Sequence, residues 1–147
     1  MQDLRLISQT LLGEKISQTG LIQSITNELS RINKLGISQA VLITDLTSTN
    51  VEPSKKIILF RIIQEAISNA TKHAPGSKIE IQINTKDDQL LISISDDGPG
   101  FNPNDGKAGG IGLLNMKNRA ATIGAKFSIT GNPGKGTVIQ IELPLHG

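Results

Sequence analysis

The spacing of hydrophobic positions changes several times along this chain, and each change predicts an element. Apolar residues recur at helical spacing over residues 21–35, 53–74 and 113–123, which predicts three helices. Elsewhere the apolar residues form short runs or alternate with polar ones, as in strands of a sheet. The strands are expected at residues 40–46, 78–85, 90–95, 127–129 and 138–143.

Short turns indicate how these strands are connected. Asp87-Asp88 joins two alternating runs, and the glycine-containing residues 132–136 join two more. Strands that follow one another through such turns pair side by side. One face of the sheet reads as polar and the other as apolar, and the apolar face requires a covering layer. The pattern therefore predicts an α+β fold, a two-layer sandwich in which a mixed, mostly antiparallel sheet is covered on one face by about three helices.

The amino-acid composition argues against several classes of function for this chain, beginning with nucleic-acid binding and cysteine chemistry. The chain is 37% hydrophobic but only 2% aromatic, so its core is aliphatic and it lacks stacking platforms for single-stranded nucleic acid. The net charge is +2 without a basic block, and we expect no nucleic-acid partner. The absence of cysteine excludes disulfides and thiolate chemistry and suits a reducing compartment. No apolar run approaches the roughly 20 residues of a membrane span.

The helix predicted over residues 53–74 carries a polar line beside its apolar face. Glu65, Asn69 and Lys72 follow one another at one-turn spacing, with His73 just inside the line. A carboxylate, an amide and an ammonium group on one line are suited to holding a metal ion and a phosphate. The alternative is a solvated helix edge with a Glu–Lys pair, and the helix alone does not decide between them.

Asp96 continues the alternation of Ile92 and Ile94, so it points to the covered face of the sheet, while Asp97 points to solvent. A carboxylate directed inward needs a hydrogen-bond donor. The amino group of adenine is one such donor, and the N–H groups of the glycine turn at residues 98–100 are another. Glycines there also allow the backbone to approach a ligand closely. The residues leave both readings open.

Residues 97–112 are glycine-rich and lack apolar periodicity, and a segment of this length in a compact domain is usually either functional or disordered. Its end, Gly109-Gly-Ile-Gly112, leads into the helix predicted from Leu113, where free N–H groups favour an anion. No Lys-Ser/Thr pair follows, as it does in a P-loop. No strand delivers the glycines within a βαβ unit, as in a dinucleotide fingerprint.

The chain carries four short motifs in a fixed order: Glu65-x-x-x-Asn69-x-x-Lys72-His73, Asp96-Asp-Gly-Pro-Gly100, Gly110-Ile-Gly-Leu113 and Gly134-Lys-Gly-Thr137. With these motifs, roughly residues 20–143 resemble the ATP-binding catalytic domain of two-component sensor histidine kinases. That domain shares its Bergerat-type fold with gyrase-, chaperone- and mismatch-repair-type ATPases. Residues 60–66 and 112–116 look more like the nitrate-sensor and lipid-thermosensor subfamily than the commoner kinases.

The resemblance implies a role for each matching residue. Asn69 would hold Mg²⁺ against the phosphates of ATP, Glu65 would position water or the nucleophile, and Lys72 would contact a phosphate. Asp96 would accept a hydrogen bond from adenine. The other implied ATP contacts are His73 at the ribose or phosphates, Gly98 and Gly100 near the base, Lys107 on a lid over residues 101–109, Gly110, Gly112 and Leu113 at the phosphate motif, and Thr137 near the base.

The resemblance implies a protein-histidine kinase that transfers the γ-phosphoryl group of Mg-ATP to a histidine on an adjoining dimerisation domain. Residues 1–15, with a helical pattern over residues 1–12, would be the remnant of that domain, and residues 16–147 the catalytic domain. Neither His73 nor His146 fits the phosphoacceptor position. The isolated chain is therefore expected to bind ATP without labelling itself.

The implied partners are the phosphoacceptor domain of the same kinase and a downstream response regulator. The isolated domain is expected to be monomeric and the parent kinase a homodimer. The expected location is the cytoplasm, including the cytoplasmic part of a membrane-bound sensor. Two alternatives of the same fold are an anti-sigma-factor-type serine kinase and an ATPase in which Glu65 activates water.

Overall fold

The computed structural model describes residues 20–73, 76–98, 110–132 and 134–145. The predicted order of helices and strands is confirmed within these residues, whereas the helix expected over residues 1–12 lies outside them. The elements are α2 (Leu21–Leu35), β1 (Gln39–Thr44), α3 (Pro53–His73), β2 (Lys78–Lys86), β3 (Gln89–Asp96), α4 (Gly110–Thr122), β4 (Lys126–Asn132) and β5 (Gly136–Pro144).

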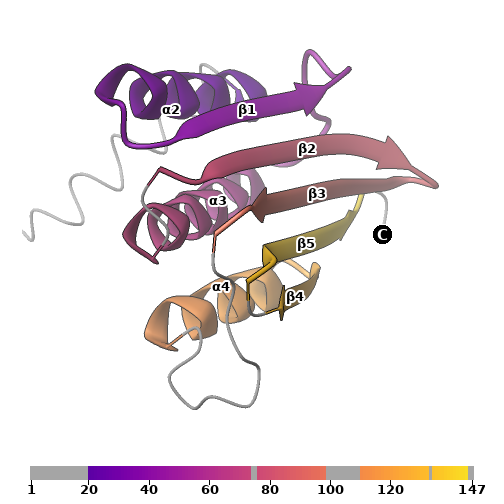
Figure 1. Ribbon diagram of the computed structural model, residues 1–147. Helices are drawn as coiled ribbons and strands as arrows, with labels where there is room; N and C mark the ends of the chain where they lie inside the picture. The colour runs from indigo at the N-terminus through magenta and orange to yellow at the C-terminus, as the bar shows by residue number, and fades with distance from the viewer. Residues whose placement is uncertain (1–19, 74–75, 99–109, 133, 146–147) are drawn as a thin grey trace, which may run out of the picture.

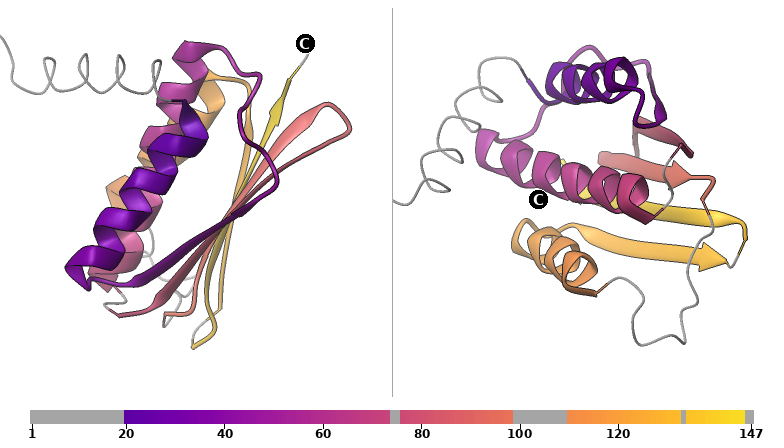
Figure 2. Two further views of the ribbon diagram at one scale, coloured as in Figure 1. Left: turned by 90° about the horizontal axis from the view of Figure 1, so that it is seen from above. Right: turned by 60° about the vertical axis from the view of Figure 1, so that its left-hand side comes forward.

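The five strands form one sheet in the order β1-β2-β3-β5-β4 (Figure 1). β1 pairs with β2 in parallel, and the other three pairs are antiparallel. Seen from above, α2, α3 and α4 all lie on the same side of the sheet (Figure 2, left). The predicted two-layer α+β sandwich with a mixed, mostly antiparallel sheet is therefore confirmed.

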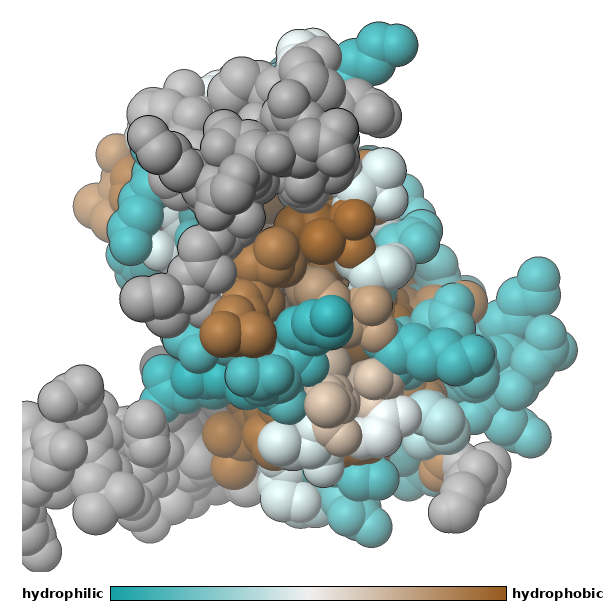
Figure 3. Space-filling view, turned by 90° about the horizontal axis from the view of Figure 1, so that it is seen from below, coloured by the Kyte–Doolittle hydropathy of each residue, from teal (hydrophilic) through white to brown (hydrophobic). Residues whose placement is uncertain are grey.

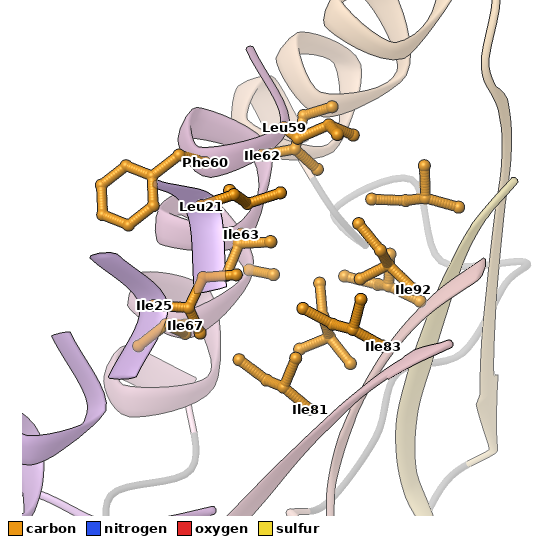
Figure 4. Packing of buried hydrophobic residues seen from close by; sticks show 14 of the residues in the cluster. Leu21, Ile25, Leu59, Phe60, Ile62, Ile63, Ile67, Ile81, Ile83 and Ile92 are labelled. Atoms are coloured by element: carbon orange, nitrogen blue, oxygen red, sulfur yellow. The ribbon is translucent and has the colours of Figure 1, made fainter. Parts of the chain in front are cut away.

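The core lies between the helices and the covered face of the sheet, and it is aliphatic as predicted. Ile81 and Ile83 of β2 are fully buried, as are Ile62 and Ile63 of α3. Figure 4 shows these α3 and β2 side chains in the space between the two layers. Burying an aliphatic side chain of this size contributes about 1.5–3 kcal/mol. This packing fixes α3, and with it the polar line, against the sheet.

Two predicted boundaries are wrong by three residues: β4 ends at Asn132 and not at residue 129, and α4 begins at Gly110 and not at Leu113. Glycine is a poor helix former, so the sequence alone favours a loop at the glycines before Leu113. In the structure the first turn of α4 packs against α3, and this tertiary contact accounts for the helical start. The N–H groups of a first helical turn have no partner within the helix. The glycine motif therefore still presents donors, now from inside the helix.

The open face of the sheet is polar along β2, as predicted, but not along β1. Val41 is 53% exposed and Ile43 is 48% exposed on this edge strand. The strand also ends at Thr44, two residues earlier than expected. The Thr44 hydroxyl donates to the Ile83 carbonyl (2.7 Å) and accepts from the Leu46 N–H (3.0 Å), which turns the chain away from the sheet.

A second region of hydrophobic surface lies on the side where α4 and β4 are found. In the view from below, hydrophobic (brown) atoms gather in the middle of this face with polar (teal) atoms on both sides (Figure 3). On α4, the side chain of Leu114 is 56% exposed.

Among the described helices, none is both long enough and apolar enough to cross a membrane.

Candidate functional site

The predicted strand residues of the site come together at one end of the sheet. Asp96 is the last residue of β3, and Thr137 lies directly opposite it near the start of β5. Both residues continue the alternation of the buried positions on their strands, so both side chains lie on the covered face. The predicted inward direction of Asp96 is therefore confirmed, and the structure brings Thr137 beside it.

The carboxylate of Asp96 is half-buried and partly satisfied. Its Oδ1 accepts a hydrogen bond from the Gly98 N–H (3.0 Å). Among the residues that the structure describes, no donor reaches Oδ2. Burial raises the pKa of Asp96; the Gly98 bond lowers it, and the charge of Asp97 raises it further. Within the described residues, the glycine turn thus occupies one carboxylate oxygen, and the other has no hydrogen-bond donor.

Asp97 is held at the same end of the sheet by β2. Its Oδ1 accepts from the Lys78 N–H (2.7 Å), and its own N–H donates to the Lys78 carbonyl (3.2 Å). From its alternation, Asp97 was expected only to face solvent, and it is exposed. Its pairing with Lys78 was not predicted, because the register of the two strands cannot be read from their alternation alone.

Gly136 lies against the backbone of the Asp96–Asp97 pair. A Cβ atom at Gly136 would collide with the Asp96 carbonyl oxygen and would lie 3.2 Å from the Asp97 Cα atom. Its φ of +88° belongs to the left-handed region. No role was predicted for Gly136 itself; the only signal was its place in the glycine motif before Thr137.

The helical part of the site is the polar line on α3. Glu65 and Asn69 are half-buried, and Lys72 is exposed. Gly112 of α4 lies against this line: an added Cβ atom would collide with Glu65 Oε1 and lie 3.3 Å from Asn69 Nδ2. The structure thus brings the glycine motif to the polar line, although the two are far apart in sequence.

The side chains of the polar line make few polar contacts within the described part of the chain. Among the described residues, the ion pairs do not include Glu65 or Lys72, so the alternative Glu–Lys pair is not formed there. No hydrogen bond within that part of the chain involves their side chains or that of Asn69. Within the described residues, the Glu65 carboxylate and the Asn69 amide lie beside Gly112 in the first turn of α4 without a hydrogen-bond partner.

Two arginines on neighbouring helices, Arg61 of α3 and Arg119 of α4, carry positive charge near each other. Arg61 lies one turn before Glu65 on α3. Burial lowers the pKa of Arg61, and the charge of Arg119 on α4 lowers it further. The repulsion between the two guanidinium groups indicates that the facing sides of α3 and α4 carry positive charge at this point.

The remaining predicted site residues divide into three groups. Leu113 is half-buried and packs against the core. Gly98 donates to Asp96, and Gly110 begins α4. The His73 side chain, Gly100, Lys107 and the predicted lid lie outside the described residues. Within the described ranges, no three His, Asp or Glu side chains are grouped so that they could hold a metal ion.

Similarity in sequence points to one family. Residues 54–147 match the family described as "Histidine kinase-, DNA gyrase B-, and HSP90-like ATPase". Sensor protein VraS of Staphylococcus aureus (strain COL) is 47% identical over 88 residues, which are 60% of this chain and 25% of VraS. The chain thus spans about a quarter of the length of the curated relatives that it matches.

The solved structures that resemble this chain share its fold. The histidine kinase domain of the Erythrobacter litoralis EL346 blue-light-activated histidine kinase has a TM-score of 0.72 and 21% identity, covering 85% of this chain and 65% of that one. Full-length ShkA, solved in complex with AMPPNP, has a TM-score of 0.68 and 19% identity, covering 86% of this chain and 29% of ShkA. At these identities the likeness shows a shared fold.

Proposed function

Because the chain belongs to the family of histidine kinase-, DNA gyrase B- and HSP90-like ATPases, we propose that it is the ATP-binding catalytic domain of a sensor histidine kinase. The observation that carries this proposal is how the motif residues are grouped. Asp96 pairs with Thr137 at one end of the sheet, and Gly112 of α4 lies against Glu65 and Asn69 of α3. These groups supply an acceptor for the base and a polar cradle for the phosphates.

Asp96 would read the base. Its Oδ2 can accept a hydrogen bond from the amino group of adenine, whereas the carbonyl O6 of guanine would repel it. Thr137, beside Asp96 on the covered face, would border the base. A hydrogen bond to a charged group of this kind contributes on the order of 1.5–3 kcal/mol.

The phosphates would lie between α3 and α4. The N–H groups of the first turn of α4 favour an anion there, and Lys72 adds a positive charge. Mg²⁺ usually takes one or two protein ligands and completes its shell with phosphates and water. The Asn69 amide oxygen could serve as one such protein ligand of Mg²⁺. The ion would neutralise the charge that develops on the phosphates during transfer.

Phosphoryl transfer depends mainly on positioning and charge, so no covalent nucleophile is needed on this chain. Glu65, next to Asn69, would orient the attacking group. The acceptor histidine would come from a dimerisation domain, and a response regulator would take the phosphoryl group onward. In this proposal the parent kinase is a homodimer, the domain lies on the cytoplasmic side, and residues 1–15 belong to the end of the dimerisation helix.

The similar proteins described above are sensor proteins and histidine kinases. They favour transfer to histidine over the serine-kinase and ATPase alternatives.

Calorimetry with Mg-ATP and Mg-GTP tests the nucleotide site. The parent chain should prefer ATP, and Asp96→Ala should lose roughly 10- to 100-fold in ATP affinity, the loss of one charge-assisted hydrogen bond. Glu142→Ala, on the open face of β5, is the matched control. Unchanged ATP binding in Asp96→Ala would remove Asp96 from the base site.

Labelling with γ-labelled ATP tests the reaction. The isolated chain should remain unlabelled, and a separate dimeric helical hairpin carrying the acceptor histidine should take up acid-labile, base-stable label. Acid-stable label on serine would instead support a serine kinase.

A further inference from the structure

Asp96 is the last residue of β3 that pairs with both neighbouring strands, so no further ladder pair holds the chain after it. The last β2–β3 ladder pair is Ile79 with Asp96, and the last β3–β5 pair is Asp96 with Thr137. Strand ends open readily unless other contacts hold them. A carboxylate that reads a base must nevertheless keep its position to within a fraction of an ångström.

On the β2 side, Asp97 continues the pairing one residue beyond the ladder. It makes two bonds with the backbone of Lys78: Oδ1 accepts from the N–H at 2.7 Å, and the Asp97 N–H donates to the carbonyl at 3.2 Å. The side chain thus takes the place of a missing strand acceptor. The residue that follows Asp96 is thereby fixed to β2.

On the β5 side, Gly136 allows the backbone of β5 to touch that of Asp96. An added Cβ atom would collide with the Asp96 carbonyl oxygen and would lie 3.1 Å from its carbonyl carbon. These are backbone atoms, which cannot move aside as the end of a long side chain can. A side chain at this position would therefore push β5 and Asp96 apart.

Gly134, in the same turn, shows that this contact is a separate requirement. It has a φ of +79°, close to the +88° of Gly136, but a Cβ atom at Gly134 would meet nothing within 4 Å. The turn needs two glycines for its backbone conformation, and only one of them is also needed for space.

We propose that Gly136 and Asp97 are positioning residues that fix the base-reading carboxylate of Asp96, Gly136 from β5 and Asp97 from β2. In this proposal neither residue needs to contact the nucleotide. Both act through the backbone of Asp96, and they keep its carboxylate at a fixed distance from Thr137. The proposal rests on the function proposed above, in which Asp96 accepts a hydrogen bond from the adenine amino group.

The test compares the affinities of the chain for Mg-ATP and for Mg-inosine triphosphate, which carries a carbonyl oxygen in place of the amino group. The parent chain should bind ATP roughly 10-fold or more tightly than the inosine nucleotide, since only ATP offers the donor. Gly136→Ala should lose most of this ratio through weaker ATP binding. Gly134→Ala, which introduces similar backbone strain without the collision, should keep the ratio within about twofold.

The Asp97 pair of variants tests the second contact and does not depend on how Gly136→Ala folds. Asp97→Ala removes the acceptor for the Lys78 N–H and should reduce the ratio several-fold. Asp97→Asn keeps a side-chain oxygen at the same place and should restore it. Thermal melting of each variant measures the purely structural cost.

The possible results are distinct. Gly136→Ala and Asp97→Ala variants that melt earlier but keep the parent's ATP-to-inosine ratio would overturn the positioning role and leave the proposed function standing. A parent chain that binds neither nucleotide, or both equally, would overturn the base-reading role of Asp96 and the positioning role with it. Loss of the ATP-to-inosine ratio in Gly136→Ala and Asp97→Ala, with the ratio retained in Gly134→Ala and Asp97→Asn, would support the positioning role.

Discussion

The site has two halves that are built in different ways. The strand half consists of Asp96, Asp97, Gly136 and Thr137, and the helix half of Glu65, Asn69, Lys72 and Gly112. In the strand half, backbone ladders, the Asp97–Lys78 bonds and the Gly98 bond hold each group. In the helix half, no hydrogen bond between described residues restrains the polar side chains; packing of α3 and α4 holds only the helices.

This difference fits the two ligand groups that the site is proposed to bind. A planar base requires a fixed acceptor, which a rigid strand end provides. A triphosphate with its metal ion and an incoming acceptor requires side chains that adjust during the reaction, and a packed helix with unpaired polar groups allows this. The strand half should therefore determine which nucleotide binds, and the helix half should determine whether transfer follows.

The largest expected effect concerns the helix half. Asn69→Asp adds a negative charge beside the phosphates and should weaken Mg-ATP binding by roughly 100-fold, since like charges at a few ångströms cost several kcal/mol in a partly buried site. Calorimetry measures the loss. Gln64→Glu adds the same charge to the same helix away from the polar line and should change the affinity little. Equal losses in the two variants would show a general charge effect.

Gly112→Ala tests whether the helix half governs transfer more than binding. The added methyl group would displace the Glu65 carboxylate, a flexible side-chain end, so the fold should tolerate it. Alanine is also a better helix former than glycine by about 1 kcal/mol. Transfer of phosphate to an added acceptor hairpin should fall roughly tenfold, because a small misplacement is costly in the transition state. Asn115→Ala, an exposed position on α4, controls for the gain in helix propensity.

Unchanged transfer in Gly112→Ala would mean that Glu65 has no positioning role. A large loss of stability would instead mean that the Glu65 carboxylate cannot move aside and that the contact between α3 and α4 is rigid.

The smallest expected effect concerns the strand half and depends on pH. Burial raises the pKa of Asp96, so folding disfavours its ionised form. Asp96→Asn should therefore stabilise the nucleotide-free chain by up to about 0.5 kcal/mol at neutral pH, the range for partly exposed sites. Below about pH 4 the carboxyl is protonated in both folded and unfolded states, and the gain should vanish. Melting curves at several pH values measure it; a gain that persists at pH 3 would contradict the burial argument.

Much of the fold and part of the site could be predicted from local patterns. Alternation over β3 placed Asp96 on the covered face, and helical spacing on α3 placed Glu65 and Asn69 on one line. Both inferences need only the period of one element. The aliphatic core likewise followed from composition.

The unpredicted features depend on contacts between elements. The Asp97–Lys78 pairing requires the register of β2 against β3, and the collision at Gly136 requires the position of β5 against β3. The start of α4 at Gly110 reflects packing on α3 that outweighs the low helix propensity of glycine. The exposed Val41 shows that an apolar residue in an edge strand need not face the core.

The parallel pairing of β1 with β2 has a consequence for the order in which the chain folds. β2 and β3 are joined by the two-residue turn Asp87-Asp88, whose positive φ values suit a tight hairpin. Such hairpins form in microseconds. β1 reaches β2 only after the chain has passed through the whole of α3, and long-range contacts of this kind form slowly. The segment that carries Asp96 and Lys78 should therefore be structured early, while α3 and the side chains proposed to bind phosphate should reach their final place among the last parts of the domain.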